Sequence, residues 1–85
     1  MVEITKLVEY RNIKNNGVGF LAITDKKLPV NCVHHTSCYE VKEMHFKQKV
    51  IISGSKNGSY YFTSDYQDAI NKFKKMKTCQ KCFGE

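Results

Sequence analysis

The sequence predicts an α+β domain in which a small antiparallel sheet of four or five strands carries one C-terminal helix, stapled by a structural zinc site. Short β-branched and aromatic segments are separated by turn dipeptides, one segment has helical spacing, and all four cysteines fall in two short clusters. With 85 residues the chain has room for one core, so we expect a single zinc-stapled domain over residues 1–85. A chain this short is marginally stable without a metal or another cross-link.

The N-terminal part of the chain predicts a hairpin. Residues 2–10 alternate between apolar and polar side chains, as a strand does, although their apolar residues also suit one face of a short helix. Asn16-Gly17 tolerates positive φ at both residues and predicts a turn. Residues 17–24 then read as a second strand, and a hairpin is the simplest connection between the two.

The middle of the chain predicts an irregular segment followed by strands. Residues 30–38 carry the first cysteine cluster and are expected to lack regular structure. The alternation in residues 39–47 indicates a strand whose pattern slips near its middle, as at a bulge or a break. The β-branched content of residues 49–53 indicates another strand. A second Asn-Gly dipeptide then predicts a hairpin turn into a strand at residues 60–63.

One helix is predicted, at residues 65–77. Ser64 and Gln67 have the spacing of a capping box, which satisfies backbone N–H groups at a helix N-terminus. The side chains recur at the spacing of one buried helix face: Tyr66, Ala69, Ile70, Phe73 and Met76 or Lys77. Lysines crowd the C-terminal half, where the helix dipole tolerates positive charge.

The two cysteine clusters together predict one tetrahedral zinc site. The cysteines are Cys32, Cys38, Cys79 and Cys82. The last two have the C-x-x-C spacing of a zinc knuckle, whereas the first two enclose five residues. We favour four cysteine ligands over three cysteines and one histidine, for which His35 is the alternative ligand and His34 a second choice. Two disulfides are the other option, but the knuckle spacing and the adjacent histidines count against them.

No catalytic pattern is recognisable in the sequence. Four cysteines would close the coordination shell, whereas a catalytic zinc keeps an open position. The H-x-E…P-C-x-x-C pattern of zinc deaminases is missing, because no Glu follows His34 or His35 at the required spacing and no Pro precedes Cys79. We therefore expect that the protein is not an enzyme, and we predict no catalytic residue.

The charge of the chain points to a nucleic-acid partner. The net charge is +6, and five lysines without an acid among them lie near the C-terminus: Lys72, Lys74, Lys75, Lys77 and Lys81. A charge run on a helix is commonly its solvated face, but this run continues into the C-x-x-C segment. We therefore expect phosphate contacts from these lysines, and binding to RNA alone or within a ribonucleoprotein complex.

The alternative function is a protein inhibitor whose positive face blocks a nucleic-acid-processing protein. Aromatic side chains and arginines commonly anchor such interfaces. The candidate anchors are Tyr10, Arg11, Tyr39 and Tyr61. The edges of so small a sheet also leave room for a homodimer. No apolar segment approaches 18 residues and the first residues do not resemble a secretory signal, so we expect a cytoplasmic protein without a membrane partner.

The residue usage is rich in Lys, Asn, Ile and Tyr, with one Pro and no Trp. In this it resembles the small basic host-takeover and counter-defence proteins of AT-rich T-even-type phages, among them inhibitors of ToxN-type RNase toxins. The resemblance covers composition only and carries over no residue. It implies an antitoxin-like protein in the host cytoplasm that binds a toxin RNase, with RNA held in the complex by the lysines.

Overall fold

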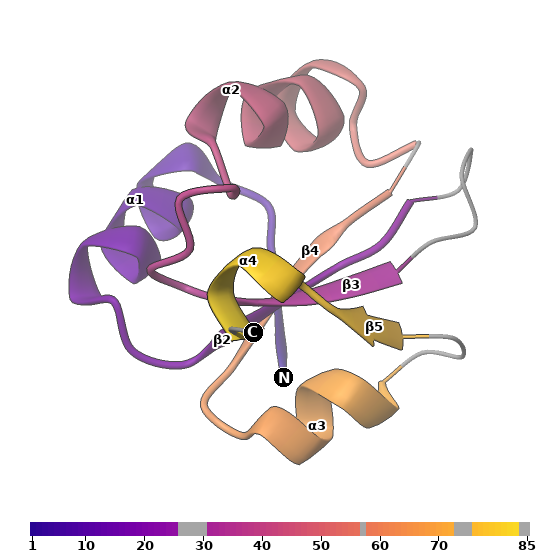
Figure 1. Cartoon of the computed structure of the whole chain (residues 1–85). Coiled ribbons are helices and arrows are strands. Elements are labelled where there is room, and N and C mark those ends of the chain that lie inside the picture. The colour runs from indigo at the N-terminus through magenta and orange to yellow at the C-terminus, as the bar shows by residue number, and fades with distance from the viewer. Residues whose placement is uncertain (26–30, 57, 73–75, 84–85) are drawn as a thin grey trace.

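The computed structural model describes residues 1–25, 31–56, 58–72 and 76–83, which form an α+β fold around one five-stranded sheet (Figure 1). The strands are β1 (Val2–Ile4), β2 (Phe20–Ile23), β3 (Asn31–His35), β4 (Tyr60–Thr63) and β5 (Met76–Thr78). The helices are α1 (Leu7–Asn16), α2 (Glu43–Phe46) with its π-helical continuation η1 (Lys47–Ile52), α3 (Tyr66–Asn71) and α4 (Gln80–Phe83). The predicted fold class, a small and mostly antiparallel sheet with helical cover, is confirmed.

The sheet has the strand order β1-β4-β2-β3-β5. The pairs β1–β4, β4–β2 and β2–β3 are antiparallel, whereas β3 and β5 run parallel. Strand β2 therefore lies at the centre, and β5 forms the edge beside β3. This parallel edge brings the C-terminal cysteines to the middle of the chain.

The predicted N-terminal hairpin is wrong. Only the first three residues of the 2–10 segment pair in the sheet, and the chain then enters α1. The Glu9 carboxylate accepts hydrogen bonds from the backbone N–H groups of Thr5 and Lys6, which stabilises the start of the helix. Gly17 ends it at φ +66°, with its N–H donating to Ile13 O. The Asn-Gly signal thus marks a helix terminus, and β4 separates β1 from β2.

Three predictions for the middle of the chain are also wrong. Residues 31–35, expected to be irregular, form strand β3, and residues 43–52, expected to be two strands, are helical through α2 and η1. Phe46 and Val50 lie four residues apart and are both buried, so helical spacing is what places them in the core. With no strand before it, the second Asn-Gly cannot form a hairpin, and Asn57 lies outside the described residues. The strand at residues 60–63 is confirmed.

The predicted helix at 65–77 is shorter than expected. Helix α3 begins after Asp65, whose side chain accepts a hydrogen bond from Gln67 N at 2.9 Å, so the cap is one residue later than predicted. The helix ends at Asn71, and the chain returns to the sheet as β5. Phe73 lies outside the described residues, and Met76 belongs to a strand rather than to the helix face.

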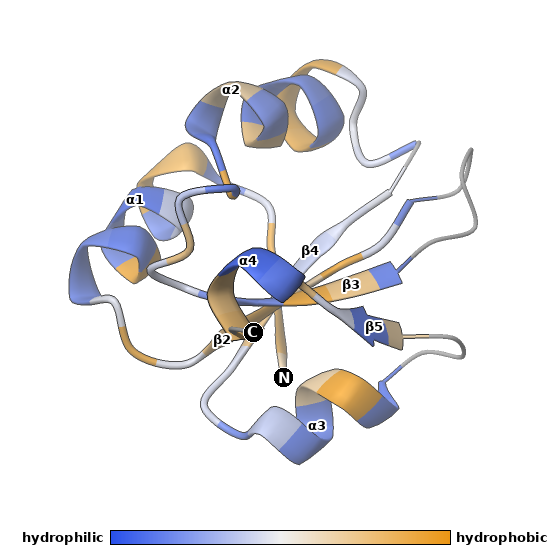
Figure 2. Ribbon diagram, viewed as in Figure 1, coloured by the Kyte–Doolittle hydropathy of each residue, from blue (hydrophilic) through white to orange (hydrophobic). Residues whose placement is uncertain are grey.

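The core lies on both faces of the sheet. Helices α1, α2 and η1 cover one face and α3 the other, and the inner strands are more hydrophobic than the outer sides of α1 and α2 (Figures 1 and 2). The Phe46 ring stacks on Tyr10 with centroids 4.5 Å apart and meets Tyr60 edge-on at 5.1 Å. This aromatic group fixes α2 on the sheet. None of the described helices has the length and apolar character that crossing a bilayer requires.

Candidate metal centre

Four potential metal ligands from three parts of the chain meet beside the β3–β5 edge. They are His34, Cys38, Cys79 and Cys82, and their ligand atoms all lie within 4.8 Å of one another. The Sγ atoms of Cys38 and Cys79 are 3.9 Å apart. Two sulfur atoms bound to one tetrahedral zinc at about 2.3 Å would be roughly 3.8 Å apart. The cluster is thus consistent with a metal ion such as zinc.

The parallel pairing of β3 and β5 positions the C-terminal half of this cluster. The N–H of Cys79 donates to Val33 O at 2.9 Å, which extends the ladder by one residue beyond β5. The chain then enters α4, where Phe83 N donates to Cys79 O at 2.9 Å. This single turn carries Cys82 back toward β3, where its Sγ accepts a hydrogen bond from His35 N at 3.3 Å.

The other half of the cluster comes from β3 and the turn that follows it. His34 is a strand residue, and Cys38 lies in the turn after the strand, where its N–H donates to His35 O at 3.0 Å. The carbonyl of Cys38 accepts from Val41 N at 3.2 Å and from Lys14 Nζ at 2.8 Å. Cys38 is buried, so both its backbone and its side chain are held in place.

Lys14 is a residue of the centre that sequence reasoning missed. It reaches from α1, and its ammonium group lies close enough to Cys38 and Cys82 for their charges to act on it. Burial lowers the pKa of Lys14, and the two thiols oppose this shift. Three thiolates carry one negative charge more than a divalent ion neutralises, so a lysine here offsets the excess. Nothing in the sequence distinguishes this lysine from the others.

The thiol groups differ in how readily they lose a proton. Burial acts to raise the pKa of Cys79, but hydrogen bonds from the backbone N–H groups of Cys82 and Lys81 outweigh it, so the pKa is lowered. Burial raises the pKa of Cys82 to about 12. Cys79, at the start of α4, therefore loses its proton more readily than Cys82.

The imidazole of His34 is held in the form that a metal requires. Burial lowers its pKa and the nearby Lys14 ammonium lowers it further, against the opposing charge of Glu40. Its Nδ1 atom is buried and has no hydrogen-bond partner. A neutral imidazole with a buried nitrogen that lacks a donor or acceptor fits a metal ligand, because coordination satisfies that nitrogen.

The structure places Cys32 outside the cluster and His35 on the opposite face of the sheet. Side chains alternate along a strand, so Cys32 and His34 share one face of β3 while His35 points to the other. Cys32 lies two residues before His34, roughly 6.6 Å along the strand. Its Sγ contacts Val33 O at 3.8 Å, and burial raises its pKa to about 11. The described structure thus brings together three cysteines and His34, and Cys32 of the predicted four-cysteine set does not join them.

His35 belongs to a group of four half-buried rings on the α3 side of the sheet. Its ring stacks on Phe83 at 4.3 Å, and Phe20 stacks on the same phenylalanine at 6.2 Å. Tyr66 of α3 completes the group, 5.6 Å from both phenylalanine rings. We call Phe20, His35, Tyr66 and Phe83 the aromatic cluster. It adjoins the metal centre, because Phe83 directly follows Cys82.

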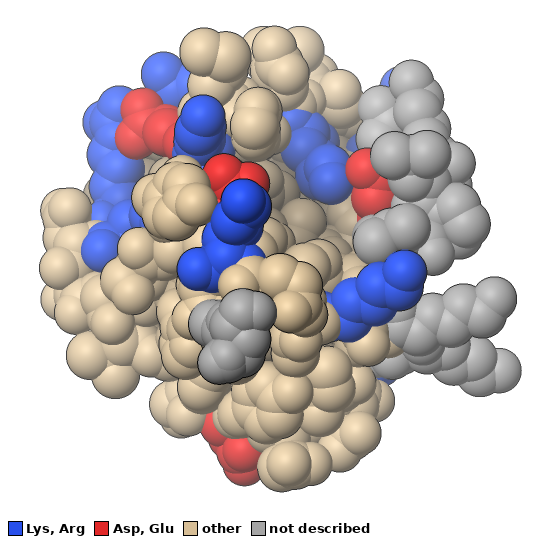
Figure 3. All heavy atoms as spheres, viewed as in Figure 1, with Lys and Arg blue, Asp and Glu red and all other residues tan. Residues whose placement is uncertain are grey.

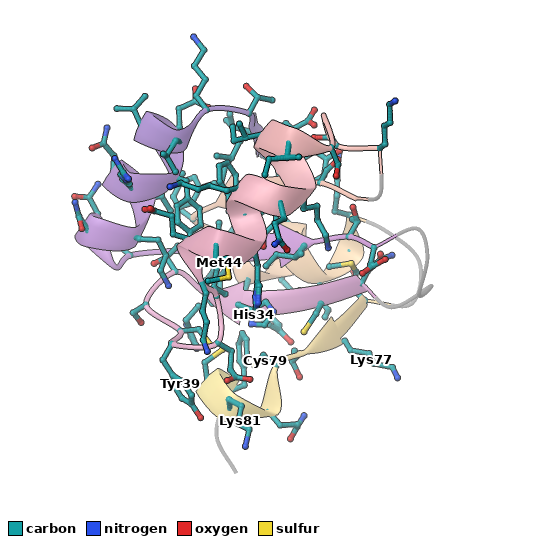
Figure 4. All side chains as sticks on the ribbon, turned by 90° about the horizontal axis from the view of Figure 1, so that it is seen from above. His34, Tyr39, Met44, Lys77, Cys79 and Lys81 are labelled. Carbon is teal, nitrogen blue, oxygen red and sulfur yellow. The ribbon has the colours of Figure 1, made fainter. Side chains whose placement is uncertain are left out.

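The predicted lysines do not lie on one helix. Lys72 follows α3 and lies 5.9 Å from the Tyr61 ring centroid, whereas Lys77 is on β5 and Lys81 on α4. Lys77 and Lys81 are exposed and project away from the domain in different directions (Figure 4). Basic and acidic side chains are interspersed over the face that Figure 3 shows. Lys74 and Lys75 lie outside the described residues.

The four candidate anchors for a protein partner lie in different surroundings. Tyr10 is only 2% exposed and its hydroxyl donates to Val41 O, so as a core residue it is not available at the surface. Arg11 is exposed but forms a bidentate ion pair with Glu43 at 2.8 and 3.0 Å. Tyr61 is half-buried, whereas Tyr39 is 65% exposed.

The fold and the cluster define the protein as a small α+β domain with a Cys3His site able to hold a metal ion. Comparisons with protein-family models, curated proteins and solved structures give no match. Within the described part of the chain, this is the one group of metal-ligating side chains that converges.

Proposed function

We propose that the protein is a non-enzymatic, zinc-containing module that binds RNA, alone or within a ribonucleoprotein complex. The observation that carries this proposal is the position of Lys77 and Lys81. Both are exposed, and they lie on the two elements, β5 and α4, between which Cys79 enters the metal centre.

Zinc is the metal that the donor set fits best. Three thiolates and one imidazole are ligands of structural zinc, whereas magnesium and calcium prefer oxygen ligands. Four protein ligands fill a tetrahedral shell and leave no position for a substrate or a reactive water. The role of the metal is therefore to fix the C-terminal segment on β3, and this supports a binding module rather than an enzyme.

The surface around the metal centre supports RNA as the ligand. Lysine side chains neutralise phosphates, and aromatic rings stack with unpaired bases. The aromatic cluster is half-buried, so part of its ring surface is accessible, and its member Phe83 lies on α4 two residues after Lys81. A single strand that follows the β5–α4 segment would meet both kinds of contact. Lys72, Lys74 and Lys75 precede β5 in the sequence and remain predicted phosphate contacts.

The test is the salt dependence of RNA binding by a double variant, Lys77→Gln with Lys81→Gln. Each phosphate contact on a single strand contributes roughly 0.7 to the slope of log affinity against log salt. The double variant should therefore lower the slope by about 1.4 between roughly 50 and 200 mM salt. Lys6→Gln with Lys56→Gln is the matched control, since both lysines are exposed elsewhere and the net charge changes equally. Equal slopes for the two double variants would contradict the proposal.

A protein inhibitor is the second candidate, and exposed apolar side chains favour it. Tyr39 and Met44 are 65% and 66% exposed, and both flank the segment that leads from the metal centre into α2. In Figure 4, Tyr39 projects on the side that carries α4 and Lys81. Exposed aromatic and methionine side chains are typical anchors of protein interfaces.

The partner in this second case would be a nucleic-acid-processing enzyme, and the resemblance in composition to phage counter-defence proteins makes a toxin RNase the first class to test. A pull-down from nuclease-treated lysate separates the candidates. A partner that remains after treatment and is lost in Tyr39→Ala favours the inhibitor. A partner that disappears on treatment favours RNA.

A further inference from the structure

A hollow of about 690 Å³ lies between the sheet and the α2–η1 helix. Its volume falls within the roughly 300–1,000 Å³ that ligand pockets occupy. Ile23 of β2, Val41 and Tyr60 of β4 give it an apolar side. His34, a residue of the metal centre, also lines it, so the hollow and the centre share a wall.

The polar side of the hollow offers hydrogen-bonding groups that the fold does not use. Glu40, His45 and Gln48 line it, and within the described part of the chain their side chains form no hydrogen bond or ion pair. A carboxylate accepts hydrogen bonds, and a glutamine amide both donates and accepts. The hollow therefore presents a mixed set of acceptors and donors to a ligand.

The charges in the hollow argue against an anionic ligand. Lys49 also lines it, but its ammonium group donates to Thr24 O at 3.0 Å and pairs with Asp25 at 3.6 Å. The Glu40 carboxylate is exposed and has no basic partner within the described residues. A phosphate would meet an unpaired carboxylate and a lysine already engaged. A neutral ligand with its own N–H donors fits better.

The helix that forms one wall is π-helical over Lys47–Ile52. The N–H of Ser53 donates to Gln48 O at 3.1 Å, which closes the wide turn. Gln48 and Ile52 both line the hollow, while Val50 between them is buried in the core. Most π-helical segments are single turns, and they occur frequently at functional sites. Here the turn places an amide and an apolar side chain on the same wall.

We propose that the hollow binds one nucleobase, presented by an RNA strand or by a free nucleoside. A flat heteroaromatic ring packs on the apolar side, Gln48 hydrogen-bonds the base edge, and Glu40 accepts from an exocyclic amino group. Uracil has no such amino group, so adenine, cytosine and guanine are the bases that fit. The RNA source rests on the proposed function, whereas the base site itself can be tested without it.

The experiment measures fluorescence anisotropy of labelled oligo(A), oligo(C) and oligo(U), and calorimetry with the four neutral nucleosides. The wild type should bind oligo(U) most weakly. Gln48→Ala should lower affinity for the preferred base roughly tenfold and leave the salt slope unchanged. Gln80→Ala removes an exposed amide outside the hollow and serves as the control. Glu40→Gln should reduce the discrimination against uracil, and Glu3→Gln is its control.

The outcomes separate this inference from the proposed function. RNA binding that is equal for all bases, or unchanged by Gln48→Ala, overturns the base site and leaves RNA binding intact. Binding of a nucleoside that Gln48→Ala weakens, without binding of any oligonucleotide, supports the base site and contradicts the RNA function. Absence of binding to both kinds of ligand overturns both.

Discussion

The backbone N–H of His35 donates to Sγ of Cys82 at 3.3 Å, across 47 residues of sequence. The residue next to one ligand on β3 thus holds another ligand on α4. An N–H donor stabilises a thiolate, so the strand supports the metal centre through its backbone as well as through His34. Because the two chain segments meet through this bond and the β3–β5 pairing, loss of the metal should loosen the C-terminal segment first.

The first prediction concerns which residues bind zinc. The chain should bind one zinc, and Cys38→Ser, Cys82→Ser and His34→Ala should each abolish or greatly weaken binding, because ligand loss opens the tetrahedral shell. Cys32→Ser and His35→Ala are matched controls that should retain one zinc, since neither side chain is in the cluster. Zinc stoichiometry by mass spectrometry under native conditions is the measurement. Loss of zinc in Cys32→Ser would contradict this ligand set and favour the four-cysteine site.

Lys14→Met should weaken zinc affinity by roughly 10- to 100-fold, the usual effect of changing a group behind the ligands. The substitution removes the bond to Cys38 O and the positive charge beside the thiolates but keeps much of the side-chain volume. Competition with a chromogenic chelator measures the affinity. Lys6→Met, on an exposed lysine at the other end of α1, should leave it unchanged. Equal affinities in the two variants would show that Lys14 does not compensate the charge.

Zinc should be released as the pH falls, because protons compete for the three thiolates and the imidazole. Burial and then Lys14 lower the pKa of His34, so this ligand stays neutral to a lower pH than a free histidine. In Lys14→Met the pKa of His34 should rise toward its ordinary value, and release should begin at a higher pH. A pH titration of bound zinc with an indicator dye tests this order. Release at the same pH in both proteins would contradict it.

Local signals predicted the local part of the centre, and long-range geometry decided the rest. Cys79 and Cys82 lie one helical turn apart, so their spacing alone indicates that they share a metal. The choice among Cys32, His34 and His35 depends on which face of the sheet, and which position along β3, lies beside Cys38, Cys79 and Cys82, and no short pattern contains that information. The sequence predicts an irregular 30–38 segment, so it does not indicate which of these side chains share one face of a strand.

The same limit explains the error at residues 49–53. The β-branched content of Val50, Ile51 and Ile52 favours a strand locally. In the fold, however, Phe46 and Val50 fill one site over the sheet at helical spacing, and Ile51 and Ile52 remain exposed. Tertiary packing thus outweighs the intrinsic strand preference of this segment. In β2 and β4, by contrast, strand preference and packing favour the same structure.

Phe46→Ala should test this packing by lowering the free energy of unfolding by about 3–5 kcal/mol, the usual cost of a large core truncation. Phe46 is fully buried between Tyr10 and Tyr60, so the substitution leaves a cavity beneath α2. Met44→Ala, two residues earlier and 66% exposed, should change stability by roughly 0.5 kcal/mol or less. Urea unfolding of the zinc-loaded proteins measures both. Similar effects from the two substitutions would contradict the placement of α2.

Tyr10 should make the domain sensitive to alkali. Burial, and then the charge of Glu43, raise its pKa from 10.0 to about 12. The unfolded chain loses the phenol proton near its ordinary pKa of 10.0, whereas the folded chain keeps it. The contribution of Tyr10 to stability is therefore complete below pH 10 and is lost as the pH rises toward 12, at about 1.4 kcal/mol per pH unit.

Tyr10→Phe should flatten this alkaline loss while costing about 1 kcal/mol at neutral pH, because the bond to Val41 O is removed. Tyr39→Phe is the control, since Tyr39 is 65% exposed and the substitution removes a phenol hydroxyl at the surface. Urea unfolding at pH values from 7 to about 11 measures the difference. If Tyr10→Phe and the wild type lose stability equally above pH 10, other groups that burial keeps protonated, Tyr60 foremost, dominate the alkaline response.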